Sequence, residues 1–129
     1  MSLHDRPTPA EILEAVREYL LEEVAPTADR RARFRALIAA NVLTIAEREL
    51  AAAGADEVAE EDLLAALDLR TGTLDERRTT LARLIRNGEY DAPQAWLLAV
   101  AYARETVRRK LAVANPKFLE RSSARARPG

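Results

Sequence analysis

The sequence predicts an all-α fold, and three observations carry this prediction. The first is a helix-start pattern that occurs at residues 8–11, 73–76 and 91–94. Each copy places an oxygen-bearing side chain three residues before Glu or Gln, so that the two can satisfy free N–H groups of the first turn. The second is a series of breaks at which helices are expected to end, the clearest being Gly88 and Asn115-Pro116. The third is that no segment alternates like a β-strand.

The first two predicted helices cover residues 8–24 and about 29–53. The first ends before Pro26 and has one apolar face, formed by Ile12, Leu13, Val16, Leu20 and Val24. The second ends at Gly54, a residue suited to the position that follows a helix. Both helices are therefore predicted from their apolar spacing and from the residues that stop them.

Three further helices are expected at residues 57–69, 74–87 and 92–114. The first two have apolar residues at helical spacing and are followed by glycines, and the third ends at Asn115-Pro116. After Leu119 the sequence consists mostly of Arg, Ser and Ala without periodicity. We therefore expect residues 120–129 to form a disordered basic tail.

The second predicted helix is expected to lie at the centre of the fold. Between residues 36 and 46 only Asn41 and Thr44 are polar, and a helix that is apolar nearly all round is typically packed on several sides. One stripe on it consists of Phe34, Ile38, Val42 and Ile45. The sequence thus predicts an all-α, single-domain bundle of about five helices over residues 1–119, with the second helix buried at its centre.

The composition argues against catalysis. The chain has no cysteine, its single histidine is His4, and its four glycines do not form a phosphate-binding loop. Nucleophilic triads that need His or Cys, and zinc sites built from His and Cys, therefore lack their parts. No Glu is followed three residues later by His, as the di-iron bundles require. We expect no enzyme activity, no cofactor and no metal in this chain.

The sequence also predicts a cytoplasmic location for the protein. Residues 1–9 contain no apolar core of a secretory signal. No apolar run approaches the roughly 18 residues that indicate a membrane span.

The charge is strongly segregated along the chain, although the net charge is −1. Residues 1–69 carry 7 Lys and Arg against 15 Asp and Glu, and residues 70–129 carry 13 against 6. This pattern can indicate a surface for nucleic acid or for an acidic partner. It can equally reflect acidic and basic helices that pack side by side, or two copies that pair as a homodimer. Residues 61–88 have the proportions of a helix-turn-helix motif with its turn at Arg70-Thr71-Gly72, and its second helix would offer Arg77, Arg78 and Arg83 to DNA.

Five residues are candidates for contact with a ligand or partner: Asn41, Trp96, Arg104, Lys110 and Asn115. Asn41 lies within an apolar stripe, where it either fixes helix register or holds a ligand. Trp96, the only tryptophan, either fills the core or anchors a partner. Arg104 is expected at the edge of the apolar face, paired with an acidic residue of the first helix.

Several segments resemble a small bacterial all-helical family without an assigned function. They are residues 4–8 with 11–24, Arg33-Phe34, residues 39–43 with 47–49, and residues 110–119, which include Lys110, Asn115 and Pro116. Members of that family are typically encoded beside acyl-CoA dehydrogenases and aminoglycoside-phosphotransferase-like kinases. The resemblance implies an accessory role for such an enzyme, and it assigns no catalytic or ligand residues.

The leading functional hypothesis is a non-catalytic accessory or interaction subunit for a phosphotransferase-like kinase or an acyl-CoA-processing enzyme. Two alternatives stay open. One is a nucleic-acid-binding module that uses the basic C-terminal half of the chain. The other is a regulatory domain that binds a small molecule in a pocket around Asn41, Trp96 and Arg104.

Overall fold

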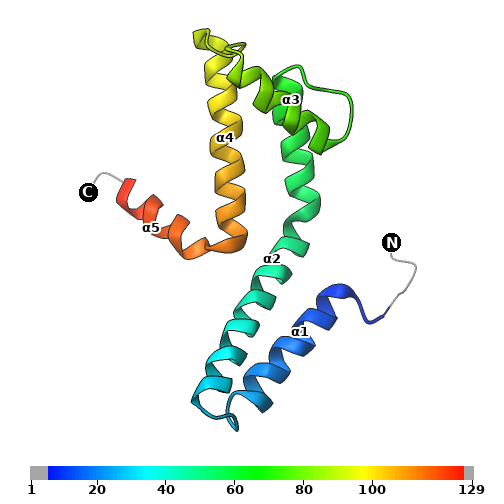
Figure 1. Ribbon diagram of the computed structural model, residues 1–129, viewed down its shortest axis with the longest axis vertical. Helices are drawn as coiled ribbons and strands as arrows, with labels where there is room; N and C mark the ends of the chain where they lie inside the picture. The colour runs from blue at the N-terminus through cyan, green and yellow to red at the C-terminus, as the bar shows by residue number, and fades with distance from the viewer. Residues whose placement is uncertain (1–5, 127–129) are drawn as a thin grey trace. The chain divides into compact units, whose positions relative to one another are not determined.

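The computed structural model describes residues 6–126, and within this range all regular secondary structure is helical (Figure 1). The elements are α1 (Pro9–Tyr19), the π-helical segment η1 (Leu20–Val24), α2 (Arg30–Ala66), α3 (Leu74–Arg86), α4 (Pro93–Ala114) and α5 (Pro116–Ala126). The all-α prediction is confirmed. In the described range no helix combines the length and the apolarity needed to cross a membrane. His4 and residues 127–129 lie outside the described part of the chain.

Two of the three predicted helix starts are confirmed. The hydroxyl of Thr8 accepts a hydrogen bond from the N–H of Glu11 at 3.2 Å, and the hydroxyl of Thr73 accepts one from Glu76 at 3.1 Å. The third prediction is wrong by one residue. Ala92 is the N-cap of α4 and makes no side-chain hydrogen bond, because its methyl group has no acceptor atom, and Pro93 follows it at the start of the helix.

The predicted break at Gly54 is wrong, because α2 continues through it from Arg30 to Ala66. The two helices expected at 29–53 and 57–69 are therefore one helix. A glycine in a helix interior costs about 1 kcal/mol relative to alanine, and the alanines on both sides of Gly54 favour continuation. The helix ends instead where Asp68 adopts a left-handed conformation with φ 64° and the N–H of Leu69 reaches the carbonyl of Leu64 at 2.9 Å.

The expectation of a disordered tail after Leu119 also differs from the structure. Helix α5 runs from Pro116 to Ala126, so residues 120–126 are helical. The break at Asn115 is confirmed, but Asn115 also begins the next helix, since its side-chain oxygen accepts a hydrogen bond from the N–H of Phe118 at 3.3 Å. The absence of apolar periodicity concealed this helix because α5 is short and mostly polar.

The chain divides into two compact units, residues 1–53 and 54–129. In the first unit α1 and η1 run antiparallel to the first part of α2 (Figure 1). The buried residues of this hairpin are small, namely Ala25, Ala36 and Ala40. The two helices are also joined by an ion pair between Arg17 and Glu47 at 3.0 Å. Large apolar side chains of this unit, such as Leu13, Leu20 and Leu43, are only half-buried, so the described residues of the hairpin include no fully buried large side chain.

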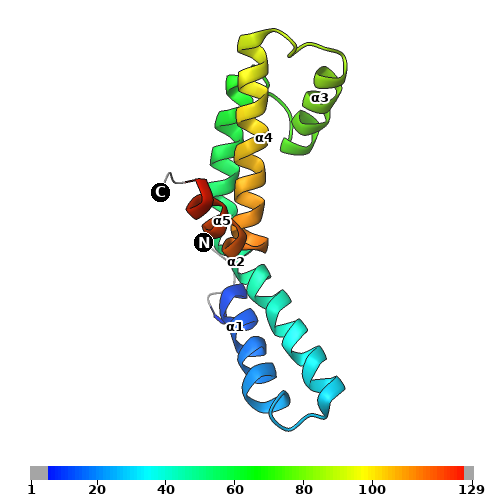
Figure 2. The same ribbon diagram turned by 90° about the vertical axis from the view of Figure 1, so that its left-hand side faces the viewer.

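The second unit contains the rest of α2 together with α3, α4 and α5. Figure 2 shows α4 alongside the end of α2, with α3 packed at one end and α5 turning away from the other. The core consists of Leu64, Leu67 and Leu81, surrounded by partly buried Leu69, Leu74, Tyr90 and Tyr102. Leu64 is completely buried, which makes it the centre of this core.

Truncation of Leu64 tests this assignment of the core. We expect Leu64→Ala to lower the free energy of unfolding by about 2–5 kcal/mol, because it removes buried methyl groups and leaves a cavity. Leu98→Ala, in the same unit but 44% exposed, is the matched control and should change it by less than about 1 kcal/mol. Urea unfolding followed by circular dichroism measures both, and equal losses would contradict the assignment.

Alanine substitutions at Gly54 and Gly72 are expected to change the stability of the protein in opposite directions. A Cβ at Gly54 meets nothing within 4 Å, so we expect Gly54→Ala to stabilise the protein by about 0.5–1 kcal/mol. Gly72 has φ 93° and a Cβ there lies 2.8 Å from the Glu76 carboxylate, so Gly72→Ala should destabilise it. Thermal unfolding of both variants gives the signs, and a destabilised Gly54→Ala would contradict a continuous α2.

Candidate functional site

The most closely connected group of polar side chains lies inside the second unit, where α2, α3 and α4 meet. The Glu60 carboxylate of α2 accepts a hydrogen bond from Arg78 of α3 at 2.7 Å and another from the Tyr102 hydroxyl of α4 at 2.6 Å. The Glu60 side chain is only 15% exposed. One carboxylate therefore joins three helices, and two of its partners come from helices distant in the sequence.

A second set of ion pairs extends this connection along α4. Arg109 of α4 reaches Asp56 of α2 at 2.7 Å and Glu105 on its own helix at 2.9 Å. Glu105 also binds Arg108. Together with Glu60, Arg78 and Tyr102, these four residues form what we call the polar network. Tyr102, Glu105 and Arg109 share the inward side of α4 with half-buried Ala95, Ala99 and Thr106, whereas Arg108 is exposed.

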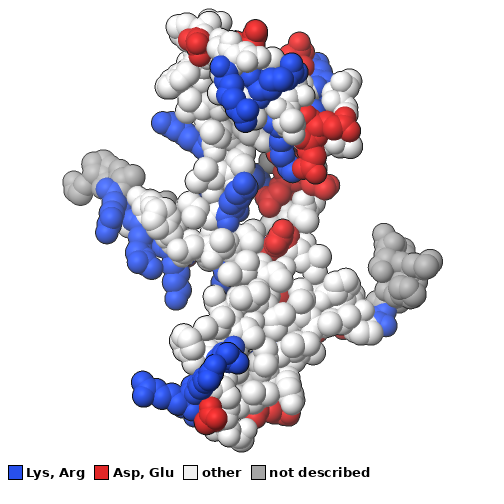
Figure 3. Space-filling model, viewed as in Figure 1, with Lys and Arg blue, Asp and Glu red and all other residues white. Residues whose placement is uncertain are grey.

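The polar network explains the charge segregation of the sequence. The acidic end of α2 packs against basic α3 and α4, and Figure 3 shows red and blue side chains intermingled there. Of the three arginines that a helix-turn-helix would offer to DNA, Arg78 is paired with Glu60, and Arg77 is buried and paired with Glu61 at 3.0 Å. Among the explanations of the charge segregation, the packing of acidic against basic helices is therefore the one that direct contacts support.

The electrostatics of the polar network follow from these contacts. The hydrogen bond from Arg78 lowers the pKa of Glu60, against the opposing effect of burial, and Tyr102 lowers it further. Burial and the hydrogen bond to Glu60 raise the pKa of Tyr102. Arg108 and Arg109 bring the pKa of Glu105 down to about 2. The carboxylates of Glu60 and Glu105 are therefore held in the charged form, which suits a structural connection between helices.

Because the inward side of α4 is polar, its apolar stripe faces outward. Trp96 is 54% exposed, Leu97 60% and Val107 55%. We call these three residues the α4 outer face. Of the two roles expected for Trp96, filling the core is therefore wrong. Tyr102, Glu105 and Arg109 occupy the inward positions, where they complete ion pairs and hydrogen bonds that the apolar residues could not make.

The predicted burial of α2 is also wrong in its first part. Phe34 is 64% exposed, and Leu37, Ile38 and Val42 are exposed beside it. These four residues, which we call the α2 apolar face, lie on the side of the helix roughly opposite the alanines that contact α1. Figure 3 shows the surface of this unit as mostly white on the side in view. The helix is apolar nearly all round, but α1 covers only one side of it.

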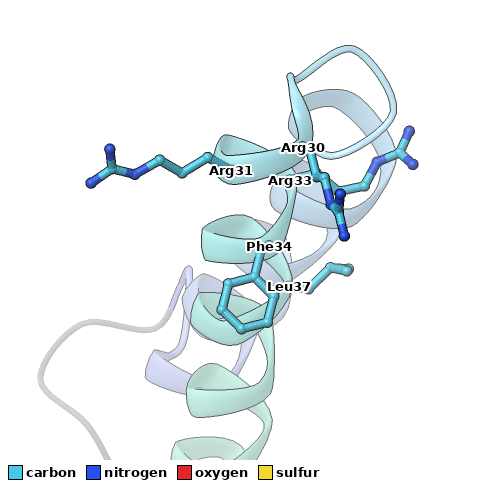
Figure 4. Close-up of a pocket in the computed structure, with 5 residues that line it drawn as sticks. All are labelled: Arg30, Arg31, Arg33, Phe34 and Leu37. Carbon is cyan, nitrogen blue, oxygen red and sulfur yellow. The ribbon is translucent and has the colours of Figure 1, made fainter.

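An open hollow of about 620 Å³ lies at the start of the α2 apolar face. It is lined by Arg30, Arg31, Arg33, Phe34 and Leu37 (Figure 4). Arg33 donates to the carbonyl of Ala25 at 3.0 Å, and in the described residues no ion pair involves Arg30 or Arg31. Cations in the first turn of a helix oppose its dipole, so these arginines are not explained by helix stability.

The five candidate residues all lie on the surface. Asn41 is exposed beside the α2 apolar face, so the expectation that it is buried among apolar side chains is wrong. Trp96, Arg104 and Lys110 are exposed along α4, and Asn115 caps α5. Asn41 belongs to the first unit, whereas Trp96 and Arg104 belong to the second. Trp96 and Arg104 lie eight residues apart on α4, which is about 12 Å along the helix.

Sequence reasoning missed Glu60, Arg78 and Tyr102. The charge segregation was the available signal, but it does not say which carboxylate meets which arginine. Within the range that the structure describes, no group of three or more His, Cys, Asp or Glu side chains is arranged to hold a metal ion.

The described residues define an all-α protein in which charged side chains join helices while large apolar side chains stay exposed. The chain belongs to the family described as Domain of unknown function (DUF6285), whose family model matches residues 26–118. This match includes α2, α3, α4 and the first residues of α5, and it agrees with the expected membership of an uncharacterised domain family. No curated protein and no solved structure matches the chain.

The pH dependence of stability tests the role of Glu60. Its lowered pKa in the folded state means that the carboxylate stabilises the fold above its unfolded pKa of about 4.3 and loses this contribution as the pH falls through the folded value. We expect Glu60→Gln to cost about 1–3 kcal/mol near pH 7, and the difference from wild type to shrink below about pH 4.

Unfolding in urea over a pH series measures this difference. Glu57→Gln, an exposed residue on the same helix, is the control and should have little effect at any pH. A cost at Glu60 that does not change with pH would contradict the assignment.

Proposed function

We propose that the chain is a non-catalytic interaction subunit that binds a partner protein through the α2 apolar face. The observation that carries the proposal is the exposure of Phe34, Leu37, Ile38 and Val42 on one side of one helix. A contiguous apolar patch of large side chains is typical of a surface that another protein covers. An exposed aromatic residue such as Phe34 is also a common anchor of such interfaces.

The charges at the edge of this face indicate the chemistry of the partner. Arg30, Arg31 and Arg35 are exposed next to it, and in the described residues none of them is in an ion pair. Up to Val42, every exposed charged side chain of α2 is basic. A partner with an apolar patch bordered by carboxylates would fit this surface and would be oriented by it.

We identify the partner class from the family resemblance. It implies a phosphotransferase-like kinase or an acyl-CoA-processing enzyme, of which the acyl-CoA dehydrogenases are the expected type. The chain would then act as an accessory subunit of that enzyme. Of the residues the resemblance singles out, Asn41 lies beside the α2 apolar face and is accessible to the partner.

The nucleic-acid alternative has weaker support. Its main motive was the basic C-terminal half, and Arg77, Arg78, Arg108 and Arg109 of that half are engaged with carboxylates. Phosphate contacts need arginines that are free to replace counterions.

Affinity capture with matched variants tests the proposal. The tagged protein and the double variant Phe34→Ser/Ile38→Ser are compared in nuclease-treated lysate of the source organism, and Val58→Ser, 62% exposed elsewhere on α2, is the control. We expect wild type and control to retain a kinase or dehydrogenase of the named classes, and the double variant to bind the purified enzyme about tenfold or more weakly by titration calorimetry.

Three results would contradict the proposal. The first is that wild type retains neither enzyme class, and the second is that the double variant binds the enzyme as tightly as wild type. The third is that wild type retains the enzyme in untreated lysate but loses it after nuclease treatment. The last result would instead favour a nucleic-acid-binding module.

A further inference from the structure

The α4 outer face is a second exposed apolar surface, and its charges all have one sign. Trp96, Leu97 and Val107 are more than half exposed. Every exposed charged side chain of α4 is basic, namely Arg104, Arg108 and Lys110. Arg108 is paired with Glu105, whereas in the described residues Arg104 and Lys110 are in no ion pair. This face therefore fits an apolar surface that carries carboxylates.

Helix α1 and η1 present such a surface. Ile12, Val16 and Tyr19 are exposed and lie on one side of α1, which we call the α1 outer face. Every exposed charged side chain of α1 and η1 is acidic, namely Glu14, Glu18, Glu22 and Glu23. Of these, Glu22 and Glu23 follow Tyr19 by three and four residues and therefore lie next to the α1 outer face, whereas Glu14, two residues from both Ile12 and Val16, lies on the opposite side of the helix. The arginine within α1, Arg17, is half-buried and paired with Glu47.

We propose that two copies of this chain pair through the α1 outer face of one copy and the α4 outer face of the other. Opposite charges then border two apolar stripes, which both attracts the surfaces and sets their orientation. The α2 apolar face is the wrong surface for α4, because Arg30, Arg31 and Arg35 would meet Arg104 and Lys110. Charge thus selects α1 from the two apolar faces of the first unit.

The lengths of the two helical surfaces also agree. At a rise of about 1.5 Å per residue, α1 with η1 spans about 24 Å and α4 about 33 Å, so the shorter surface fits within the longer one. The proposed pair is two-fold, so the same contact occurs twice, α1 on α4 and α4 on α1.

Charge reversal provides a specific test. Sedimentation velocity on the full chain should give a mass of twice 14.3 kDa at high concentration, with dissociation favoured by raised salt. We expect Arg104→Glu and Glu23→Arg each to weaken the dimer about tenfold or more, because each places like charges in both copies of the contact. Arg86→Glu on α3 and Glu57→Arg on α2 reverse exposed charges outside the proposed contact. They are the matched controls and should leave the dimer intact.

Mixing the two reversed variants gives the most selective result. In the mixed dimer one contact has both native residues and the other has both reversed residues, so opposite charges meet in each. Dimers should therefore return on mixing to within about threefold of wild-type affinity, and also in the double variant Glu23→Arg/Arg104→Glu.

A monomeric wild type at high concentration would overturn the proposal, as would a dimer unaffected by either reversal or one that mixing does not restore. The result is independent of the proposed partner binding. Phe34→Ser/Ile38→Ser should leave the dimer unchanged, and Arg104→Glu should leave capture of the partner enzyme unchanged.

Discussion

The carboxylate of Glu60 is the connection on which the arrangement of the second unit depends. It brings Arg78 of α3 and Tyr102 of α4 to one point on α2, at distances of 2.7 and 2.6 Å. A partly buried carboxylate needs such donors, because an unpaired charge at this position would be strongly destabilising. Asp56 and Arg109 add a second attachment one helical turn along α2, so α4 is held to α2 at two points and its rotation is fixed.

This fixed rotation has a direct consequence for function. The inward side of α4 is occupied by residues of the polar network, and the apolar side is left to face outward. In the first unit a different cause has the same effect, since α1 packs against the small side chains Ala36 and Ala40 and leaves Phe34 and Ile38 exposed. In both units several large apolar side chains thus stay on the surface, where other proteins can bind them, although Leu64, Leu67 and Leu81 form a core in the second unit.

The sequence predicted much of the fold because helix formation is largely local. The caps at Thr8 and Thr73 and the break at Asn115 depend on neighbouring residues, and the structure confirms them. Gly54 was misleading for a physical reason, since glycine permits a helix end without requiring one. The fate of this glycine depends on flanking alanines and on contacts that Asp56 and Glu60 make with distant helices.

The candidate surfaces were harder to predict. Phe34, Trp96 and Val107 have the spacing of core residues, and a single sequence does not distinguish an apolar stripe that faces the core from one that faces a partner. The distinction here depends on which side of α4 carries Tyr102 and Arg109, and those residues show their role only when Glu60 and Asp56 are placed opposite them. Asn41, Trp96, Arg104 and Lys110 were placed on helices correctly and Asn115 at a helix end, but the burial expected for Asn41 was wrong.

The central claim is that the apolar side of α4 is free for intermolecular contact, and the fluorescence of Trp96 tests it most directly because this is the only tryptophan. At low protein concentration and raised salt, we expect emission typical of a solvated indole and efficient quenching by acrylamide. As the concentration rises, emission should shift to the blue and quenching should fall. A blue-shifted, unquenched Trp96 at every concentration would mean that the chain buries this side of α4 within itself, and would contradict the account.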